Sequence, residues 1–326
     1  MIIIDFVLLL ISIFFLVKSS GYLVSSASNI AKHFGVKQII IGLTVVAFGT
    51  SIPELASSIA AIFAKDSDII IGNVVGSNIS NIGLILAIGT LITIVSIKDK
   101  IIKRDIYFLT FITVIFYIFS LNGSISRIEG LIFILFFIYY LYRLFKKKKH
   151  KIEEEVQHYV KLEEEKLVYE FKRIKDFLTH KITKEIYFLL FSIVILSVSA
   201  YFTVVFLQNL ASETKIGEGI IAATLLAVGT SLPELIVTIT AARKNLNDIL
   251  IGNIIGSNIA NILIVTGIPA LFMPLQVSVK FITFIIPSMI VFTLLMLVIF
   301  KLLNNVRYIG IVFLLLYALF LILLFI

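Results

Sequence analysis

The chain has 326 residues, 60% of them apolar, with a formal net charge of +8 and no cysteine. So large an apolar share lies outside the range of soluble globular domains, and the positive charge is therefore interpreted as a sign of membrane topology rather than of nucleic-acid binding. Without cysteine there is no disulfide framework and no thiolate metal site.

Apolar stretches long enough to cross about 30 Å of hydrocarbon follow one another along nearly the whole chain. They predict an all-α polytopic membrane protein with ten transmembrane helices. The predicted spans are residues 2–31, 38–63, 69–95, 105–121, 126–145, 185–211, 217–242, 249–273, 278–300 and 307–326.

The positions of lysine and arginine predict the orientation of these spans. With the N-terminus outside, the cytoplasmic loops hold 23 of the 28 basic residues and the outer loops hold four, and only Lys18 lies within a span. This bias fits the positive-inside rule. We therefore expect a multi-pass protein of the cell membrane with both termini extracellular.

The second span, residues 38–63, contains the sequence AFGTSIPE, which ends at Glu54. Pro53 cannot donate a hydrogen bond to the carbonyl of Gly49, so the helix is expected to break here and turn backbone carbonyls toward a cavity. Ser51 and Glu54 also match a helix-capping box. A charge at this depth costs from about 3 kcal/mol upward, and glutamine would cap as well, so an ion-binding role is favoured; the two roles are compatible.

The third span, residues 69–95, contains GNVVGSNISN at 72–81. Its two glycines predict a second break, which would bring the oxygen donors Ser77 and Asn81 to the same region. The alternative interpretation is close helix packing, because Gly-x-x-x-Gly lets the backbones of membrane helices approach each other.

A charged segment, residues 146–184, separates the first five spans (1–145) from the last five (185–326). It contains no glycine or proline, and its apolar residues recur mostly at intervals of three and four, which is typical of an amphipathic helix. The favoured interpretation is a cytoplasmic spacer resting on the inner leaflet. A regulatory role is the alternative.

Both motifs recur in the second half, as AVGTSLPE ending at Glu234 and as GNIIGSNIAN with Ser257 and Asn261. Positions 44–82 align without a gap on 224–262, and more than half of the aligned positions are identical. Five spans separate the copies, so the copies are expected to cross the membrane in opposite directions. Inverted repeats with broken helices, here the second, third, seventh and eighth, are typical of secondary transporters with a site near the midplane.

Glu54 and Glu234 are the only acidic residues well inside the predicted spans. Two like charges held close together need a cation or a proton between them. Two carboxylates with carbonyl and hydroxyl oxygens supply the hard ligands of Ca²⁺, which takes about six to eight oxygens, whereas Mg²⁺ and softer metals fit less well. No resident cofactor is expected. Competition of Na⁺ or H⁺ for the same carboxylates would couple the two ion fluxes.

The sequence GTS-[IL]-PE followed by GN-x-x-GSN-x-x-N, present twice and inverted, resembles the Ca²⁺/cation antiporter superfamily, most closely the prokaryotic sodium/calcium exchangers. The resemblance implies alternating access in which the first and sixth spans slide against a fixed core. It also implies a set of ion-binding residues: Glu54, Glu234, Thr50 and Thr230 for Ca²⁺; Ala47, Ser77, Ala227 and Ser257 in addition for Na⁺; and Ser51, Ser231, Asn81 and Asn261 lining the same cavity.

One position departs from the pattern of the family. Asn261 stands where many sodium/calcium exchangers carry aspartate, which leaves two carboxylates that two protons would also neutralise. A H⁺/Ca²⁺ antiporter is therefore the alternative to Na⁺/Ca²⁺ exchange.

Two other classes fit the sequence less well. A cation channel is disfavoured by inverted repeats. An intramembrane enzyme is disfavoured because H-E-x-x-H, G-x-S-x-G and histidine within the spans are absent. We expect the chain to interact with the ions and the lipid bilayer, with no nucleic acid and no obligatory protein partner.

Overall fold

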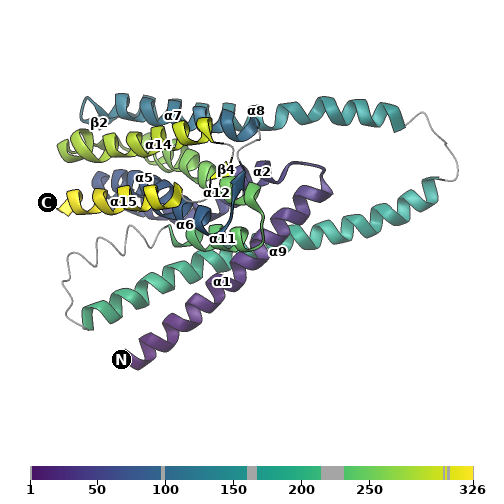
Figure 1. Ribbon diagram of the computed structural model, residues 1–326, viewed down its shortest axis with the longest axis horizontal. Coiled ribbons are helices and arrows are strands. Elements are labelled where there is room, and N and C mark those ends of the chain that lie inside the picture. The colour runs from purple at the N-terminus through teal and green to yellow at the C-terminus, as the bar shows by residue number, and fades with distance from the viewer. Residues whose placement is uncertain are drawn as a thin grey trace.

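The computed structural model describes residues 2–96, 100–159, 167–213, 231–303, 305–306 and 309–325. Nearly all of this part is helical (Figure 1). It contains six helices that are long and apolar enough to cross a membrane, or seven when the bent pair Gln38–Thr50 and Ile52–Ala64 is taken as one span. The chain is therefore a multi-pass membrane protein.

The helices of the first half include two short π-helical segments, η1 and η2, that continue α-helices. In chain order they are α1 (Ile2–His33), α2 (Gln38–Ile41), η1 (Gly42–Val46), α3 (Ala47–Thr50), α4 (Ile52–Ala64), α5 (Ser67–Ser80), η2 (Asn81–Leu86), α6 (Ala87–Ile92), α7 (Lys100–Ser120) and α8 (Arg127–Tyr159).

The second half follows a similar order in the residues that the structure describes. Its helices are α9 (Leu167–Glu213), α11 (Leu232–Arg243), α12 (Asn247–Ala260), η3 (Asn261–Val265), α13 (Gly267–Phe272), η4 (Phe281–Ile285), α14 (Ile286–Leu302) and α15 (Ile309–Phe325).

All ten predicted spans have helical counterparts, although residues 217–230 of the seventh lie outside the described part. Helix α7 begins within a charged stretch and is less apolar than the six clear spans, and the apolar part of α15, Ile309–Leu324, is shorter than they are. The separate amphipathic helix expected within 146–184 is not present as such. Instead, α8 continues to Tyr159 and α9 begins at Leu167, so both membrane helices extend into this segment (Figure 1).

Two short antiparallel strand pairs tie the ends of the helices together. β1 (Val95–Ser96) pairs with β4 (Asn305–Val306), and β2 (Ser124–Ile125) pairs with β3 (Leu275–Gln276). Because β1 precedes α7 and β2 follows it, the two pairs lie at opposite ends of that helix (Figure 1). When the alignment of the repeats is continued along the chain, β1 falls on β3 and β4 falls close to β2, so one pair is the counterpart of the other.

Helices α1 and α9 run together obliquely across one side of the bundle (Figure 1). The rings of Tyr22 and Phe188 stack at 5.9 Å, and the Thr203 hydroxyl donates to Ser12 at 2.9 Å. Asn29 donates to Glu185 at 2.9 Å near the C-terminal end of α1. This pair of helices is therefore joined at several levels along its length.

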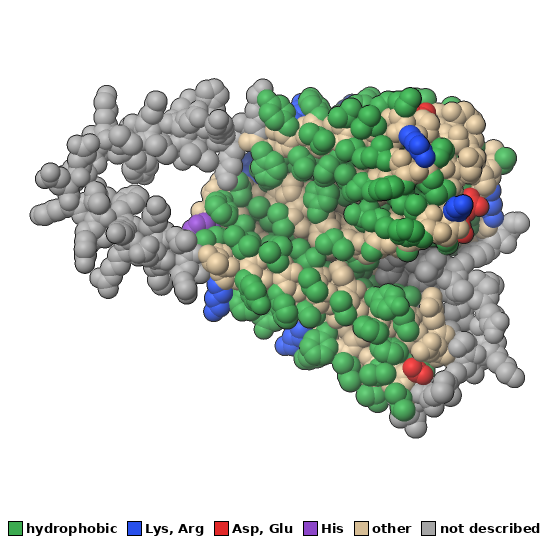
Figure 2. All heavy atoms as spheres, turned by 180° about the vertical axis from the view of Figure 1, so that it is seen from behind, with side chains coloured by type: hydrophobic (Ala, Val, Ile, Leu, Met, Phe, Trp, Pro, Cys, Tyr) green, Lys and Arg blue, Asp and Glu red, His purple; other side chains and the backbone are tan. Residues whose placement is uncertain are grey.

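The outer surface of the bundle is apolar. Figure 2 shows one face covered mostly by apolar side chains, with charged side chains mainly toward its edges. Large exposed residues such as Phe14, Phe111 and Val298 belong to this surface. Apolar side chains of this size on the outside fit contact with lipid rather than water.

Helix α12 is buried in the centre, where its glycines allow another helix to approach closely. A Cβ atom on Gly252 would lie 2.8 Å from the Cα atom of Gly42, and one on Gly256 would lie 2.5 Å from the Leu43 carbonyl oxygen. In this copy of the motif the glycines therefore serve helix packing, as the alternative interpretation proposed.

The predicted breaks have two different outcomes. The break in the second span is present as a bend of 42° at Ser51, between α3 and α4. The breaks expected within 72–81 and 252–261 were wrong in position, because α5 and α12 stay helical to Ser80 and Ala260. The irregularity begins at Asn81 and Asn261 as the π-helical segments η2 and η3. One extra residue per turn loosens the backbone there without opening it.

Candidate cation site

The bend at Ser51 places Glu54 in the first turn of α4, and Ser231 precedes Glu234 in the first turn of α11 with nearly the same backbone angles. Both glutamates are buried, with exposed fractions of 1% and 0%. The N-terminus of a helix favours a negative charge, so each carboxylate lies where its own helix stabilises it.

The capping-box interpretation of Ser51 and Glu54 is wrong, because the Ser51 side chain does not cap α4. Its hydroxyl instead donates to Glu234 Oε1 at 3.3 Å. The pattern S-x-x-E is that of a cap, but the fold turns the Ser51 hydroxyl toward the carboxylate of the other half, to which it donates a charge-assisted hydrogen bond.

Glu234 lies against the broken helix of the first half. Besides Ser51, the hydroxyl of Ser257 donates to Glu234 Oε1 at 3.4 Å. The Ser257 oxygen also lies 3.2 Å from Thr50 Oγ1 and 3.4 Å from the Ala47 carbonyl oxygen. Five of the predicted site residues, from both halves, therefore meet in one cluster.

Asparagines join the two halves in two equivalent pairs. Asn81 Nδ2 donates to Asn258 Oδ1 at 2.9 Å, and Asn261 Nδ2 donates to Asn78 Oδ1 at 3.5 Å. In the alignment of the repeats Asn81 matches Asn261 and Asn78 matches Asn258, so the second pair is the first with the halves exchanged. Since each amide NH₂ group is used in this way, the Oδ1 atoms of Asn81 and Asn261 are left without a partner.

Another pair of asparagines holds the glutamate backbones. Asn73 Nδ2 donates to the Glu54 carbonyl oxygen at 2.9 Å and to Ser58 Oγ at 3.1 Å. Asn253 makes the equivalent contacts to Glu234 and Thr238 at 3.5 and 3.4 Å. Sequence reasoning missed these residues and Asn78 and Asn258, although their identity in both copies was a usable signal.

The charge of Glu234 acts on Glu54, so the two carboxylates belong to one electrostatic unit. The described part of the chain contains no group of three or more His, Cys, Asp or Glu side chains able to hold a metal. A cation at this site would therefore meet two carboxylates, and its remaining ligands would be neutral oxygens.

Several buried oxygens around the two glutamates have no hydrogen-bond partner. Leaving a buried polar atom unpaired costs about 1–3 kcal/mol, so a cluster of them calls for a missing partner. A cation that accepts hard oxygen ligands is the kind of partner that such oxygens fit. The six atoms are Glu54 Oε1 and Oε2, Glu234 Oε2, Ser77 Oγ, Asn81 Oδ1 and Asn261 Oδ1.

The remaining predicted site residues have separate outcomes. Ser231 accepts a hydrogen bond from Ser80 at 3.2 Å and so lies beside the site. Thr230 and Ala227 lie outside the described residues.

A multi-pass helical bundle that encloses such oxygens defines the class of the molecule as a membrane ion transporter. The family model described as sodium/calcium exchanger protein matches residues 4–146 and 184–326. The chain therefore belongs to the sodium/calcium exchanger family. Members of this family are exchangers rather than enzymes, and membership supports antiport of Ca²⁺ against another cation.

The chain is similar over most or all of its length to individual known proteins. It is 41% identical to the sodium/calcium exchanger MaX1 of Methanosarcina acetivorans, covering 100% of this chain and 99% of the relative. It is 33% identical to the inner membrane protein YrbG of Escherichia coli, covering 83% and 81%. A solved structure of the sodium-calcium exchanger NCX_Mj, soaked with Na⁺ and Sr²⁺, matches with a TM-score of 0.82 and 30% identity over 98% of both chains.

Proposed function

We propose that the protein is a secondary active antiporter that exchanges Ca²⁺ for Na⁺ by alternating access. Both ions compete for one site built on Glu54 and Glu234. The observation that carries this proposal is the set of unpartnered buried oxygens, among them Glu54 Oε1 and Oε2 and Glu234 Oε2, that the two halves contribute around the glutamates. A bound cation supplies the missing partner and offsets the repulsion between the carboxylates.

The other residues of the site have distinct roles in this proposal. Thr50 and Thr230 complete the Ca²⁺ ligands, and the Na⁺ sites add Ala47, Ser77, Ala227 and Ser257. The neutral side chains Ser51, Ser231, Asn81 and Asn261 line the same cavity. Contacts among the described members of this set and Glu234, at 3.2–3.4 Å, support the assignment.

We further propose ten spans in two inverted repeats, residues 1–145 and 185–326, in the cell membrane, with both termini outside and 146–184 in the cytoplasm. The exchanged asparagine pairs and the two strand pairs support the inversion, because equivalent pairs lie at opposite ends of α7. Parallel repeats would bring equivalent elements to the same end.

Alternating access requires a body that moves against the site. The α1 and α9 pair is suited to this role, because contacts along its length join the two helices into one unit. It packs on the core mainly along α11 and α2, for example where Ser20 lies 2.7 Å from Thr240 and Gln38 donates to Ser28. Movement of this pair would open the site to one side of the membrane at a time.

A second candidate, H⁺/Ca²⁺ antiport, rests on Asn261. With asparagine at that position the described site has two carboxylates, and two protons balance one Ca²⁺ ion. The Ala47 carbonyl and the hydroxyls of Thr50, Ser77 and Ser257 favour Na⁺, because they offer neutral oxygens that a proton does not need.

Uptake of radiolabelled Ca²⁺ into proteoliposomes distinguishes the two candidates when Na⁺ and pH gradients are varied independently. We expect an outward Na⁺ gradient at equal pH to drive uptake. Ca²⁺ uptake that does not depend on the Na⁺ gradient would exclude Na⁺/Ca²⁺ exchange. Uptake driven by a pH gradient alone, and insensitive to membrane voltage, would establish H⁺/Ca²⁺ antiport instead.

A further inference from the structure

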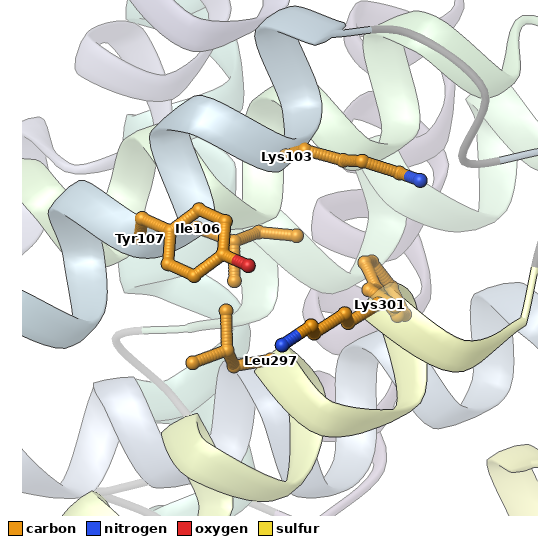
Figure 3. Close-up of a pocket in the computed structure, with 6 residues that line it drawn as sticks. Lys103, Ile106, Tyr107, Leu297 and Lys301 are labelled. Carbon is orange, nitrogen blue, oxygen red and sulfur yellow. The ribbon is translucent and has the colours of Figure 1, made fainter.

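A small cleft lies between α7 and α14, away from the cation site. Its volume is about 20 Å³, and it is lined by Lys103, Ile106, Tyr107, Leu297, Phe300 and Lys301. Figure 3 shows Lys301 extending from α14 toward Tyr107 of α7, with Leu297 and Ile106 between the two helices. The cleft therefore joins two amines from different helices with an apolar floor.

In the described part of the chain, no carboxylate balances the positive charge of this cleft, and its lining contains none. Within the described residues, the carboxylate on α7 is Asp105, which is buried and pairs with Arg104, and no ion pair involves Lys103 or Lys301. An anion from outside the chain would be the counter-charge.

The two kinds of side chain are arranged by depth. Lys103 lies one turn from the start of α7 and Lys301 lies in the last turn of α14, at the ends predicted to face the cytoplasm. Ile106 and Leu297 lie about one turn deeper. Lysine and tyrosine at this level reach the headgroup region, and the apolar side chains beneath face hydrocarbon.

The β1 and β4 strands fix the spacing of the two lysines. β1 leads into α7 and β4 follows α14, and the pair holds Val95 against Val306 and Ser96 against Asn305. The two helix ends are therefore tied together beside the cleft before any ligand arrives. A site organised in advance binds with less ordering cost than two independent surface lysines.

Lys103 and Lys301 are not repeated at the equivalent positions of the other half. When the alignment of the repeats is continued along the chain, Lys103 corresponds to Thr283 and Lys301 corresponds to Leu121, both uncharged. The equivalent positions lie at the opposite end of the same two helices. At these two repeat positions the positive charge is thus present at one end of the helices only, although Lys280 lies near the other end of α14.

We propose that this cleft binds an anionic phospholipid of the cytoplasmic leaflet, a binding site that rests on the proposed orientation but not on ion exchange. The lipid phosphate lies between the amines of Lys103 and Lys301, and the Tyr107 hydroxyl donates to it. An acyl chain follows the floor formed by Ile106 and Leu297 toward the membrane interior.

Native mass spectrometry of the purified full chain tests the proposal with phosphatidylglycerol and phosphatidylcholine of identical chains. A basic residue at a membrane surface strengthens anionic lipid binding by roughly fivefold, so the double variant K103Q/K301Q is expected to lose about 20- to 30-fold in phosphatidylglycerol affinity. Phosphatidylcholine binding should stay unchanged, and K103R/K301R should retain phosphatidylglycerol binding.

The matched control is K65Q/K280Q, which removes two charges at the predicted outer end and should bind phosphatidylglycerol like the parent chain. Equal loss in this control, or unchanged binding in K103Q/K301Q, would overturn the proposal. Displacement of the lipid by millimolar inorganic phosphate would assign the cleft to a soluble anion instead. If the double variant is unstable, K301Q alone decides the matter, because Lys301 is exposed.

Discussion

The centre of the molecule differs from the lysine-bearing ends of α7 and α14 in how the internal repeat is used. In the centre, contacts occur twice: Asn81 with Asn258, and Asn261 with Asn78. At the helix ends, Lys103 and Lys301 occur once, because their equivalents are uncharged. We interpret the duplicated asparagines as serving a function that both halves share. The lysines that are not duplicated would serve a function at one side of the membrane only.

The duplicated centre is itself unequal. Glu234 Oε1 accepts hydrogen bonds from Ser51 and Ser257, whereas both carboxylate oxygens of Glu54 lack a partner in the described part. The equivalent of Ser257 is Ser77, whose hydroxyl is also unpartnered. In the described part, the same residues in both halves therefore give one carboxylate with a single bonded oxygen and one carboxylate with none.

The largest effect on transport is expected when either carboxylate is removed. Glu54→Gln and Glu234→Gln should each abolish Ca²⁺ transport, because one remaining carboxylate cannot balance a divalent ion, while the fold stays intact. Ca²⁺ uptake by proteoliposomes and thermal unfolding in detergent measure the two effects. Asp68→Asn, an exposed change of the same charge, should retain transport. Ca²⁺ transport by either well-folded glutamine variant would show that the two glutamates do not form the cation site.

The close packing of α12 predicts the next largest effect. Gly256→Ala places a Cβ atom 2.5 Å from the Leu43 carbonyl oxygen and forces the helices apart, at a cost of about 1–3 kcal/mol. Thermal unfolding should show a lower Tm and a parallel loss of transport. Gly21→Ala is the matched control, because no atom lies within 4 Å of its added Cβ. A stable Gly256→Ala variant would contradict the packing role.

The asparagines that donate to the glutamate carbonyl oxygens test whether the two halves differ in stability. Asn73→Ala should lower the free energy of unfolding by about 1–3 kcal/mol, because its hydrogen bonds at 2.9 and 3.1 Å are lost. Asn253→Ala should cost at least as much, because Asn253 is fully buried and, besides its equivalent contacts at 3.5 and 3.4 Å, accepts a hydrogen bond from Thr50 at 3.1 Å. Denaturant unfolding of the two variants compares them directly. A smaller loss in Asn253→Ala would contradict this order.

The smallest effect is expected at Asn261. Asn261→Asp adds a third carboxylate beside Glu54 and Glu234, so transport should persist with an altered preference between Na⁺ and H⁺. Ca²⁺ uptake under separate Na⁺ and pH gradients measures that preference. An inactive, folded variant would show that the two halves are not interchangeable at this position.

Local sequence patterns predicted many features of the fold and the site. Apolar length predicted spans that have helical counterparts, and proline with glycine predicted the bend at Ser51. The sequence patterns led to wrong predictions where the same residues can serve two different structural roles. Ser51 has the pattern of a helix cap but bonds to Glu234, and the glycines expected to open α12 instead pack it against Gly42.

The sequence by itself determined the membrane class, the repeat and the residue types able to hold a hard cation, because these follow from hydropathy, identity and ligand chemistry. Only the tertiary structure decided which side chains meet across the halves, such as Asn81 with Asn258, and which carboxylate oxygens are left open. Such contacts depend on how α5 and α12 are rotated and aligned against each other. That arrangement is set by packing over the whole bundle and is not encoded within either motif.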